Sequence, residues 1–270
     1  MARRAESRRS WDGGDVAEVI SDERVAAVLR RFVRGCEPMV GRLRESDEPF
    51  DLDVGRDDAE IDHGLLDRAK ARLARVRWPG SASWARLSVE ERSHWWVSRV
   101  GRVTALAASV TGLAGALGDR LPLQNILGSA GQGLLLCAIA AEHGVEDRAT
   151  RVRLLAEVLF DRRLSHEVAV GEGDDAADAA VVRDVTGDGE PVEEPKGGRP
   201  GLKPAAKWLW RQGRMLLAIY DELEKRPHGR FYHQALGMLP VVGMAGDYLG
   251  ERSALKRVAR SAHRWIRANT

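Results

Sequence analysis

Apolar residues recur at intervals of three and four positions along most of the chain, and this spacing predicts amphipathic helices. No run of alternating apolar and polar residues is long enough to require a strand. The predicted helices cover residues 14–34, 63–78, 89–118, 122–143, 147–162, 204–226 and 251–268. The pattern therefore predicts an all-α fold: a helical bundle built around an apolar helical hairpin and interrupted by a long acidic linker.

Several of these helices carry recognisable end signals. Ser88 followed by Glu91 is a candidate capping box, in which each residue satisfies a free backbone N–H at the helix start. Pro122 suits the first turn of a helix, where its missing N–H has no partner to lose. Gly144 is a plausible C-terminal stop for that helix.

The central hairpin, residues 103–141, is the least charged part of the chain, with Asp119 and Arg120 as its only charges. Small residues recur there at intervals of four, at Ala108, Gly112 and Ala116, and such spacing lets two helices approach closely. A bilayer core of roughly 30 Å needs about 20 helical residues, and residues 121–141 are long enough. The length and the small residues suit either a protein core or a membrane hairpin.

Other features of the hairpin point in opposite directions. Four tryptophans, Trp78, Trp84, Trp95 and Trp96, lie just before it, where interfacial aromatic residues of membrane proteins are often found. Gln124 and Gln132 lie within its second helix, and polar groups are costly in lipid. We favour a buried core, with partial or reversible membrane insertion and a spanning pair as the open alternatives.

Two acidic segments separate the predicted helical regions. Residues 45–62 and 167–203 are rich in acidic residues or in Gly and Pro and have few large apolar residues, so we expect neither to form a fixed fold. They divide the chain into a basic tail, amphipathic helix and acidic linker (1–62), a first helical part (63–166), a disordered linker (167–203) and a second helical part (204–270).

The last predicted helix, ERSALKRVARSAHRWIRA, combines a basic face with an apolar one. A basic amphipathic helix can lie on an anionic membrane with its apolar face in the headgroup boundary, and it can equally be a surface helix docked on its own bundle. The candidate membrane- or anion-binding residues are Arg252, Lys256, Arg260, Arg264, Trp265 and Arg267.

The charge of the chain changes sign from block to block. Residues 167–194 hold one Lys or Arg against ten Asp or Glu, whereas residues 195–270 hold fifteen against five. Opposite blocks attract, so we expect the acidic linker to fold back on the basic C-terminal block and mask it. No helix-turn-helix, zinc-finger or aromatic RNA-binding signature accompanies the basic residues, which argues against a nucleic-acid partner.

The sequence shows no catalytic or cofactor signature. Seven histidines are scattered without a metal-binding spacing, and GSAGQG at 128–133 lacks the Lys-Ser/Thr of a phosphate-binding loop. Cys36 and Cys137 lie far apart in sequence, and we interpret Cys137, within an apolar run, as a small buried hydrophobic residue.

The basic N-terminus has no apolar segment behind it. We therefore expect a protein that is not secreted and that works in the cytoplasm or on the cytoplasmic face of the membrane.

Two segments resemble the EcsC family. SVTGLAGALGDRLPLQNILGSAGQGLLLCAIAAEHGVE (109–146) is similar to the family's Thr-Gly-containing apolar helix, break and second helix, with His143 where the family usually has Tyr. LPVVGMAGDYLGERSALKRVARSAHRWIRAN (239–269) resembles its closing region, with a Pro-x-x-Gly turn before a final basic helix. The resemblance covers about 63–166 and 204–270, brings no catalytic residues, and implies a helical, hydrophobic, membrane-associated bacterial protein.

These observations predict a non-enzymatic helical protein without cofactors. We expect it to associate peripherally with an anionic membrane surface or a membrane protein complex. The alternative is a soluble cytosolic helical scaffold or interaction protein with no lipid contact.

Overall fold

A computed structural model of the chain describes residues 20–45, 79, 82–112, 123–187, 202–224 and 247–270. These residues form helices and turns with no strand among them, which confirms the predicted all-α fold. The helices are α1 (Asp22–Glu45), α3 (Ala82–Ala85), α4 (Val89–Gly112), α5 (Leu123–Glu142), α6 (Arg148–Phe160), α7 (His166–Val170), α8 (Asp175–Thr186), α9 (Leu202–Glu224) and α11 (Asp247–Asn269). The predicted helix over 63–78 and the predicted linker over 46–62 lie outside the described residues.

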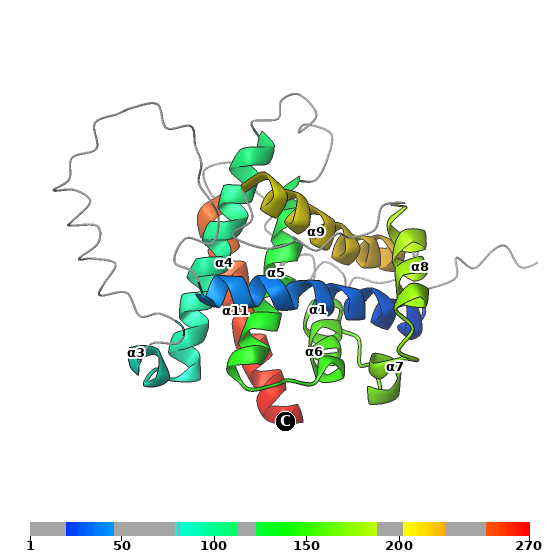
Figure 1. Ribbon diagram of the computed structural model, residues 1–270, viewed down its shortest axis with the longest axis horizontal. Helices are drawn as coiled ribbons and strands as arrows, with labels where there is room; N and C mark the ends of the chain where they lie inside the picture. The colour runs from blue at the N-terminus through cyan, green and yellow to red at the C-terminus, as the bar shows by residue number, and fades with distance from the viewer. Residues whose placement is uncertain (1–19, 46–78, 80–81, 113–122, 188–201, 225–246) are drawn as a thin grey trace, which may run out of the picture.

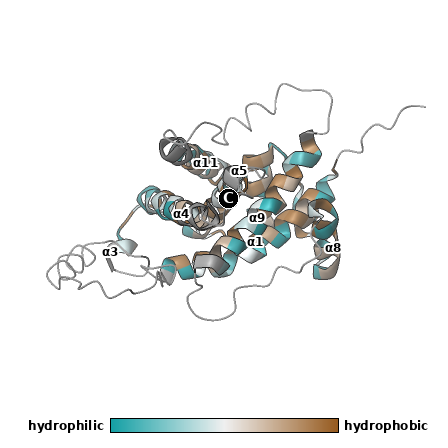
Figure 2. Ribbon diagram, turned by 90° about the horizontal axis from the view of Figure 1, so that it is seen from above, coloured by the Kyte–Doolittle hydropathy of each residue, from teal (hydrophilic) through white to brown (hydrophobic). Residues whose placement is uncertain are grey.

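The helices α4, α5 and α11 run side by side, and α1 and α9 cross them (Figure 1). Figure 2 looks from above and shows α4, α5 and α11 nearly end-on, with α1 and α9 together on one side. The shorter helices α6, α7 and α8 pack against α1. Helices that cross at steep angles in this way can surround one central helix on several sides.

The central helix is α5. All its residues from Ile126 to Ala140 are buried, and it contacts α1, α4, α6, α9 and α11. A helix that is apolar on every side needs partners on every side, and here the protein supplies them. The interpretation of residues 103–141 as a buried core is therefore confirmed for residues 126–140. In α4, Val103, Thr104 and Ala107 are buried and Ala105 is exposed, while the side chains of 108–112 and the corner at 113–122 lie outside what the structure describes.

Glycines allow the neighbouring helices to approach α5 closely. A Cβ atom added at Gly131 would lie 2.7 Å from Cγ2 of Thr104 in α4, well inside van der Waals contact. A Cβ at Gly133 would overlap the ring of Phe32 in α1, and one at Gly213 of α9 would overlap the carbonyl oxygen of Ile126. The small residues thus serve packing against α1, α4 and α9 together.

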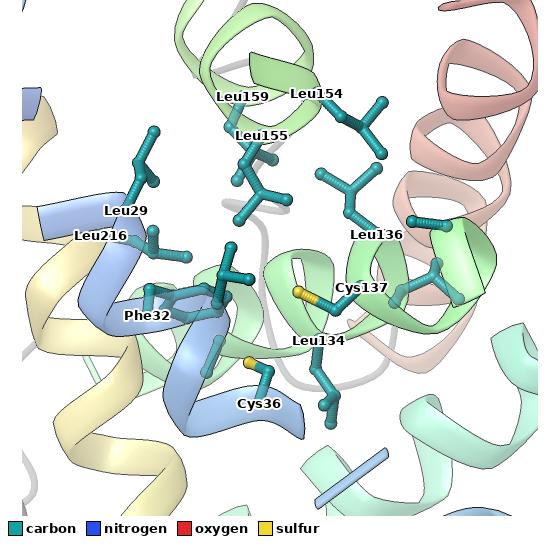
Figure 3. Packing of buried hydrophobic residues seen from close by; sticks show 14 of the residues in the cluster. Leu29, Phe32, Cys36, Leu134, Leu136, Cys137, Leu154, Leu155, Leu159 and Leu216 are labelled. Carbon is teal, nitrogen blue, oxygen red and sulfur yellow. The ribbon is translucent and has the colours of Figure 1, made fainter. Parts of the chain in front are cut away.

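Around α5, Phe32 and Leu216 lie close to Cys36 and Cys137 in one apolar cluster (Figure 3). Both cysteines are free thiols and buried, so the interpretation of Cys137 as a small buried hydrophobe is confirmed. Burial raises the pKa of the Cys36 thiol well above its usual range. The thiol therefore stays protonated and packs as an apolar group.

The predicted helix ends agree well with the structure where it describes them. The backbone N–H of Glu91 donates to Ser88 Oγ at 3.2 Å, and that of Ser88 donates to Glu91 Oε2 at 2.9 Å, which confirms the capping box. Gly144 follows α5 with φ +73°, a left-handed conformation that glycine adopts without strain. Asp147 caps α6 by accepting the N–H groups of Ala149 and Thr150.

The first helix differs from its prediction. The pattern predicts a helix over 14–34, whereas α1 begins at Asp22 and continues to Glu45 through Gly35 and Pro38. It continues because Cys36, Met39, Val40 and Leu43 keep the helical spacing and are all buried. The burial of this extra length outweighs the unfavourable helix propensity of Gly35, Pro38 and Gly41.

The prediction that residues 167–203 have no fixed fold is wrong for residues 167–186, which form most of α7 and all of α8; residues 188–201 lie outside the described part. Asp174 caps α8 by accepting the N–H groups of Ala176 and Ala177, and Gly187 ends the helix at φ +68°. The acidic side chains of α8 pair with arginines of α1, so their charge binds the segment to the fold. Composition alone does not reveal partners that lie about 150 residues away in sequence.

The predicted target of this acidic segment needs correction for its described part. Asp184, Asp178 and Asp175 pair with Arg24, Arg30 and Arg34 of α1, not with the basic C-terminal block. The four acidic residues at 188–194 lie outside the described residues. From the C-terminal block, α9 packs against α8, and Arg214 Nη2 donates to the carbonyl oxygen of Thr186 at 2.9 Å.

Candidate anion-binding surface

The outer face of α11 carries exposed cations. Lys256, Arg260 and Arg264 are all exposed, and their spacing of four places them along one side of the helix. We call these three residues the basic stripe. Arg264 also donates from Nη2 to Ser261 Oγ at 3.3 Å, a contact within the same helix that leaves its side chain at the surface.

The other predicted residues of this surface have different placements. The side chain of Arg252 lies outside what the structure describes. Arg267 is exposed and forms an ion pair with Glu90 in the first turn of α4. Trp265 is 7% exposed and turns toward α6. Of the six predicted residues, the structure brings three together on one open face.

Trp265 joins α11 to α6. Its indole N–H donates to Glu157 Oε2 at 2.8 Å, and the guanidinium carbon of Arg153 lies 5.8 Å from the ring centroid. A buried tryptophan usually satisfies its N–H in this way, and a cation over its face adds electrostatic attraction. The side chain is therefore used within the fold and does not project beside the basic stripe.

The apolar face of α11 is also used within the fold. Leu255, Val258, Ala262 and Ile266 are each no more than 2% exposed, and the helix packs against α4, α5 and α6. An amphipathic helix that dips into a headgroup boundary needs its apolar face free. In this structure α11 offers an anionic partner its charges alone.

Three of the tryptophans that precede the hairpin are likewise turned inward, while Trp78 lies outside the described residues. Trp84 and Trp96 are buried, and Trp95 is half-buried between them, with ring centroids 5.1 Å from Trp84 and 5.0 Å from Trp96. The edge-to-face arrangement is one that aromatic pairs favour. These rings join α3 to α4 and do not form an exposed aromatic belt.

At the C-terminal end of α5, two histidines meet. His143 Nε2 and His263 Nδ1 lie 2.8 Å apart, and the two rings meet at 61°. One ring must donate its N–H, and the other must accept it at an unprotonated nitrogen. This hydrogen bond therefore needs at least one neutral imidazole. The contact joins the end of α5 to α11.

Burial lowers the pKa of both histidines below the ordinary value of 6.5. Each lies near Glu90, which raises its pKa, and near Arg267, which lowers it. His143 further lowers the pKa of His263, and Glu142 raises that of His143. Burial is the largest contribution for both rings, so the neutral forms are favoured at neutral pH.

A buried carboxylate lies one residue before this pair. The side chain of Glu142 is 1% exposed, and its Oε1 accepts from Arg44 Nη2 at 2.6 Å and from the indole N–H of Trp96 at 3.1 Å. Arg92 Nη1 lies 3.4 Å from its other oxygen. These contacts tie together the ends of α1, α4 and α5, and a buried charge is tolerated because it is paired and hydrogen-bonded.

Sequence reasoning missed both of these groups. His143 and His263 are 120 residues apart, and Arg44 and Glu142 are 98 apart, so no local spacing connects them. His94 and His166 are exposed, while His63, His228 and His233 lie outside the described residues. The local sequence at His143 and Gly144 indicates only a helix end.

Among the described residues, no group of three or more His, Cys, Asp or Glu side chains is arranged to hold a metal ion. The described helices also include none with both the length and the apolar character needed to cross a bilayer. The feature of this surface that can bind a partner is its exposed positive charge.

No protein-family model, curated protein or solved structure matches the chain. The resemblance to the EcsC family therefore stays a prediction.

Proposed function

We propose that this chain is a non-enzymatic, EcsC-like bacterial protein that associates peripherally with an anionic membrane surface through the basic stripe of α11. The observation that carries the proposal is the exposure of Lys256, Arg260 and Arg264 on one face of a helix whose apolar face is held in the core. The cytoplasmic leaflet is negatively charged, and each basic residue near it contributes about 1 kcal/mol to binding.

The binding mode we propose is electrostatic, without insertion. Since Val258 and Ile266 are buried against other helices, α11 cannot place its apolar side in lipid without leaving the bundle. Exposed charges are screened within about 10 Å at 0.1 M salt, so the affinity should fall steeply as salt is raised. An insertion mechanism would keep most of its affinity in high salt.

Flotation tests the proposal with vesicles of phosphatidylglycerol and phosphatidylcholine against vesicles of phosphatidylcholine alone. At low salt we expect the full chain to float with the anionic vesicles, and Arg260→Glu with Arg264→Glu to abolish flotation. The matched control is Arg86→Glu with Lys207→Glu, which changes the net charge equally at exposed positions on other elements. Equal loss in both variants, or no flotation of the unaltered chain, would count against the proposal.

A second candidate is a helical scaffold or interaction protein with no lipid contact. It is favoured by one observation: the apolar faces of α4, α5 and α11 are occupied by one another and by α1, α6 and α9. Absence of flotation with both vesicle types at low salt would favour this candidate.

A further inference from the structure

The acidic helix α8 lies along a row of arginines on α1. Arg24 Nη2 lies 2.5 Å from Asp184 Oδ2, Arg30 Nη2 lies 2.6 Å from Asp178 Oδ1, and Arg34 forms an ion pair with Asp175. We call Arg24, Arg30 and Arg34 the arginine face of α1. Over ten residues of helix these positions span roughly 15 Å.

Arg30 is the best-held member of this face. Its Nε and Nη2 donate to the two oxygens of Asp178 at 2.9 and 2.6 Å, and its Nη1 donates to the carbonyl oxygen of Val168 at 2.8 Å. Gly171, at φ +65°, gives the guanidinium room, because a Cβ there would lie 2.6 Å from the guanidinium carbon. This two-pronged geometry is the one by which arginine binds either carboxylate or phosphate.

The attachment of α8 combines apolar and polar contacts. Val182 is buried, the half-buried Val181 and Val185 also pack against the core, and α8 packs against α9 as well as α1. Among the paired carboxylates Asp178 is buried, while Asp175 and Asp184 keep 62% and 67% of their side chains exposed. Attraction between exposed charges is weakened by salt and by competing anions, so the ion pairs are the part of this attachment that another anion can replace.

We propose that the arginine face of α1 is a second binding surface for anionic lipid, which α8 covers in this structure. The carboxylates of α8 occupy the places that lipid phosphates take when the helix is displaced. This inference rests on the proposed membrane function and adds a regulation to it: the basic stripe makes the first contact, and the lipid then competes with α8 for α1.

The first test removes the three carboxylates that pair with α1. We compare Asp175→Asn, Asp178→Asn, Asp184→Asn with a control that neutralises three exposed carboxylates away from these pairs, Glu146→Gln, Asp161→Asn, Glu172→Gln. Both variants change the net charge equally. We expect the first to need about tenfold less phosphatidylglycerol than the control for half-maximal flotation, since three arginines become available. Equal lipid requirements in the two variants would overturn the proposal.

The second test uses the unaltered chain and needs no variant to fold. Hydrogen exchange is measured on the backbone amides of residues 175–186, with and without phosphatidylglycerol vesicles, and the amides of α5 serve as reference. We expect exchange in α8 to rise at least about tenfold on binding while that of α5 is unchanged. If α8 keeps its protection in the vesicle-bound protein, the proposal is wrong.

A third comparison separates this inference from the proposed function. The three aspartate substitutions are combined with Arg260→Glu and Arg264→Glu, which remove the basic stripe. If the unaltered chain does not float but the combined variant does, membrane binding through the basic stripe is wrong and lipid binding by the arginine face is supported. If the unaltered chain floats and the aspartate variant binds no better than its charge-matched control, membrane binding through the basic stripe is supported and lipid binding by the arginine face is wrong.

Discussion

The helices α8 and α11 are both strongly charged, yet the fold uses them in opposite ways. In α11 the apolar face is buried and the charges of Lys256, Arg260 and Arg264 remain in solvent. In α8 the carboxylates of Asp175, Asp178 and Asp184 form ion pairs with α1, beside the apolar contacts of Val181, Val182 and Val185. The comparison teaches that the charges of a surface helix are available to a partner when apolar burial alone holds the helix. They are already in use when ion pairs help to hold it.

The largest effect should come from the apolar attachment of α11. Ile266→Ala removes a side chain that is 2% exposed, and we expect it to lower the free energy of unfolding by about 3 kcal/mol. Val182→Ala in α8 should cost about 1 kcal/mol, because that residue is less completely buried. Urea denaturation of both variants measures the difference, and equal losses would show that the two helices are held alike.

A smaller effect is expected at the ion pair between α1 and α8. Asp178→Asn leaves Arg30 largely buried without its charged partner, and we expect a loss of about 2 kcal/mol in unfolding free energy. Asp175→Asn breaks a pair whose carboxylate is mostly exposed and should cost under about 0.5 kcal/mol. The loss in unfolding free energy caused by Asp178→Asn should change little when 0.5 M KCl is added, since salt screens buried pairs only weakly. A loss at Asp178 no larger than that at Asp175 would contradict this view of α8.

The smallest effect on stability should come from the pair of His143 and His263. Because burial lowers the pKa of His143 and His263 in the fold, the unfolded chain binds protons at a higher pH than the folded one. The stability is therefore fully present above the ordinary value of 6.5 and decreases as the pH falls through the lowered folded values. The groups around the pair are Glu90, Glu142 and Arg267.

Thermal denaturation between pH 7.5 and 5 measures this dependence. Replacing both histidines by Gln should flatten the curve in that range, whereas His94→Gln, at an exposed position, should leave it unchanged. A steep curve that survives the double replacement would show that other groups carry the acid sensitivity.

Much of the fold could be predicted from local patterns. The helix starts at Ser88 and Asp147, the stop at Gly144 and the burial of residues 126–140 follow from capping residues and hydrophobic spacing. The basic stripe could be predicted as well, because its residues belong to one helix and their spacing determines that they share a face. The inward turn of Trp265 could not, since Glu157 lies 108 residues away.

The amino-acid sequence by itself determined that this chain is helical, where α5, α6 and α9 begin and end to within about two residues, and which faces of the long helices are apolar. Those properties depend on residues within one or two turns of each other. Tertiary structure alone decided which charges remain free, which histidines meet and that the acidic segment 175–186 folds. Each of those outcomes depends on a partner about a hundred or more residues distant, and only the packed chain brings such partners within reach.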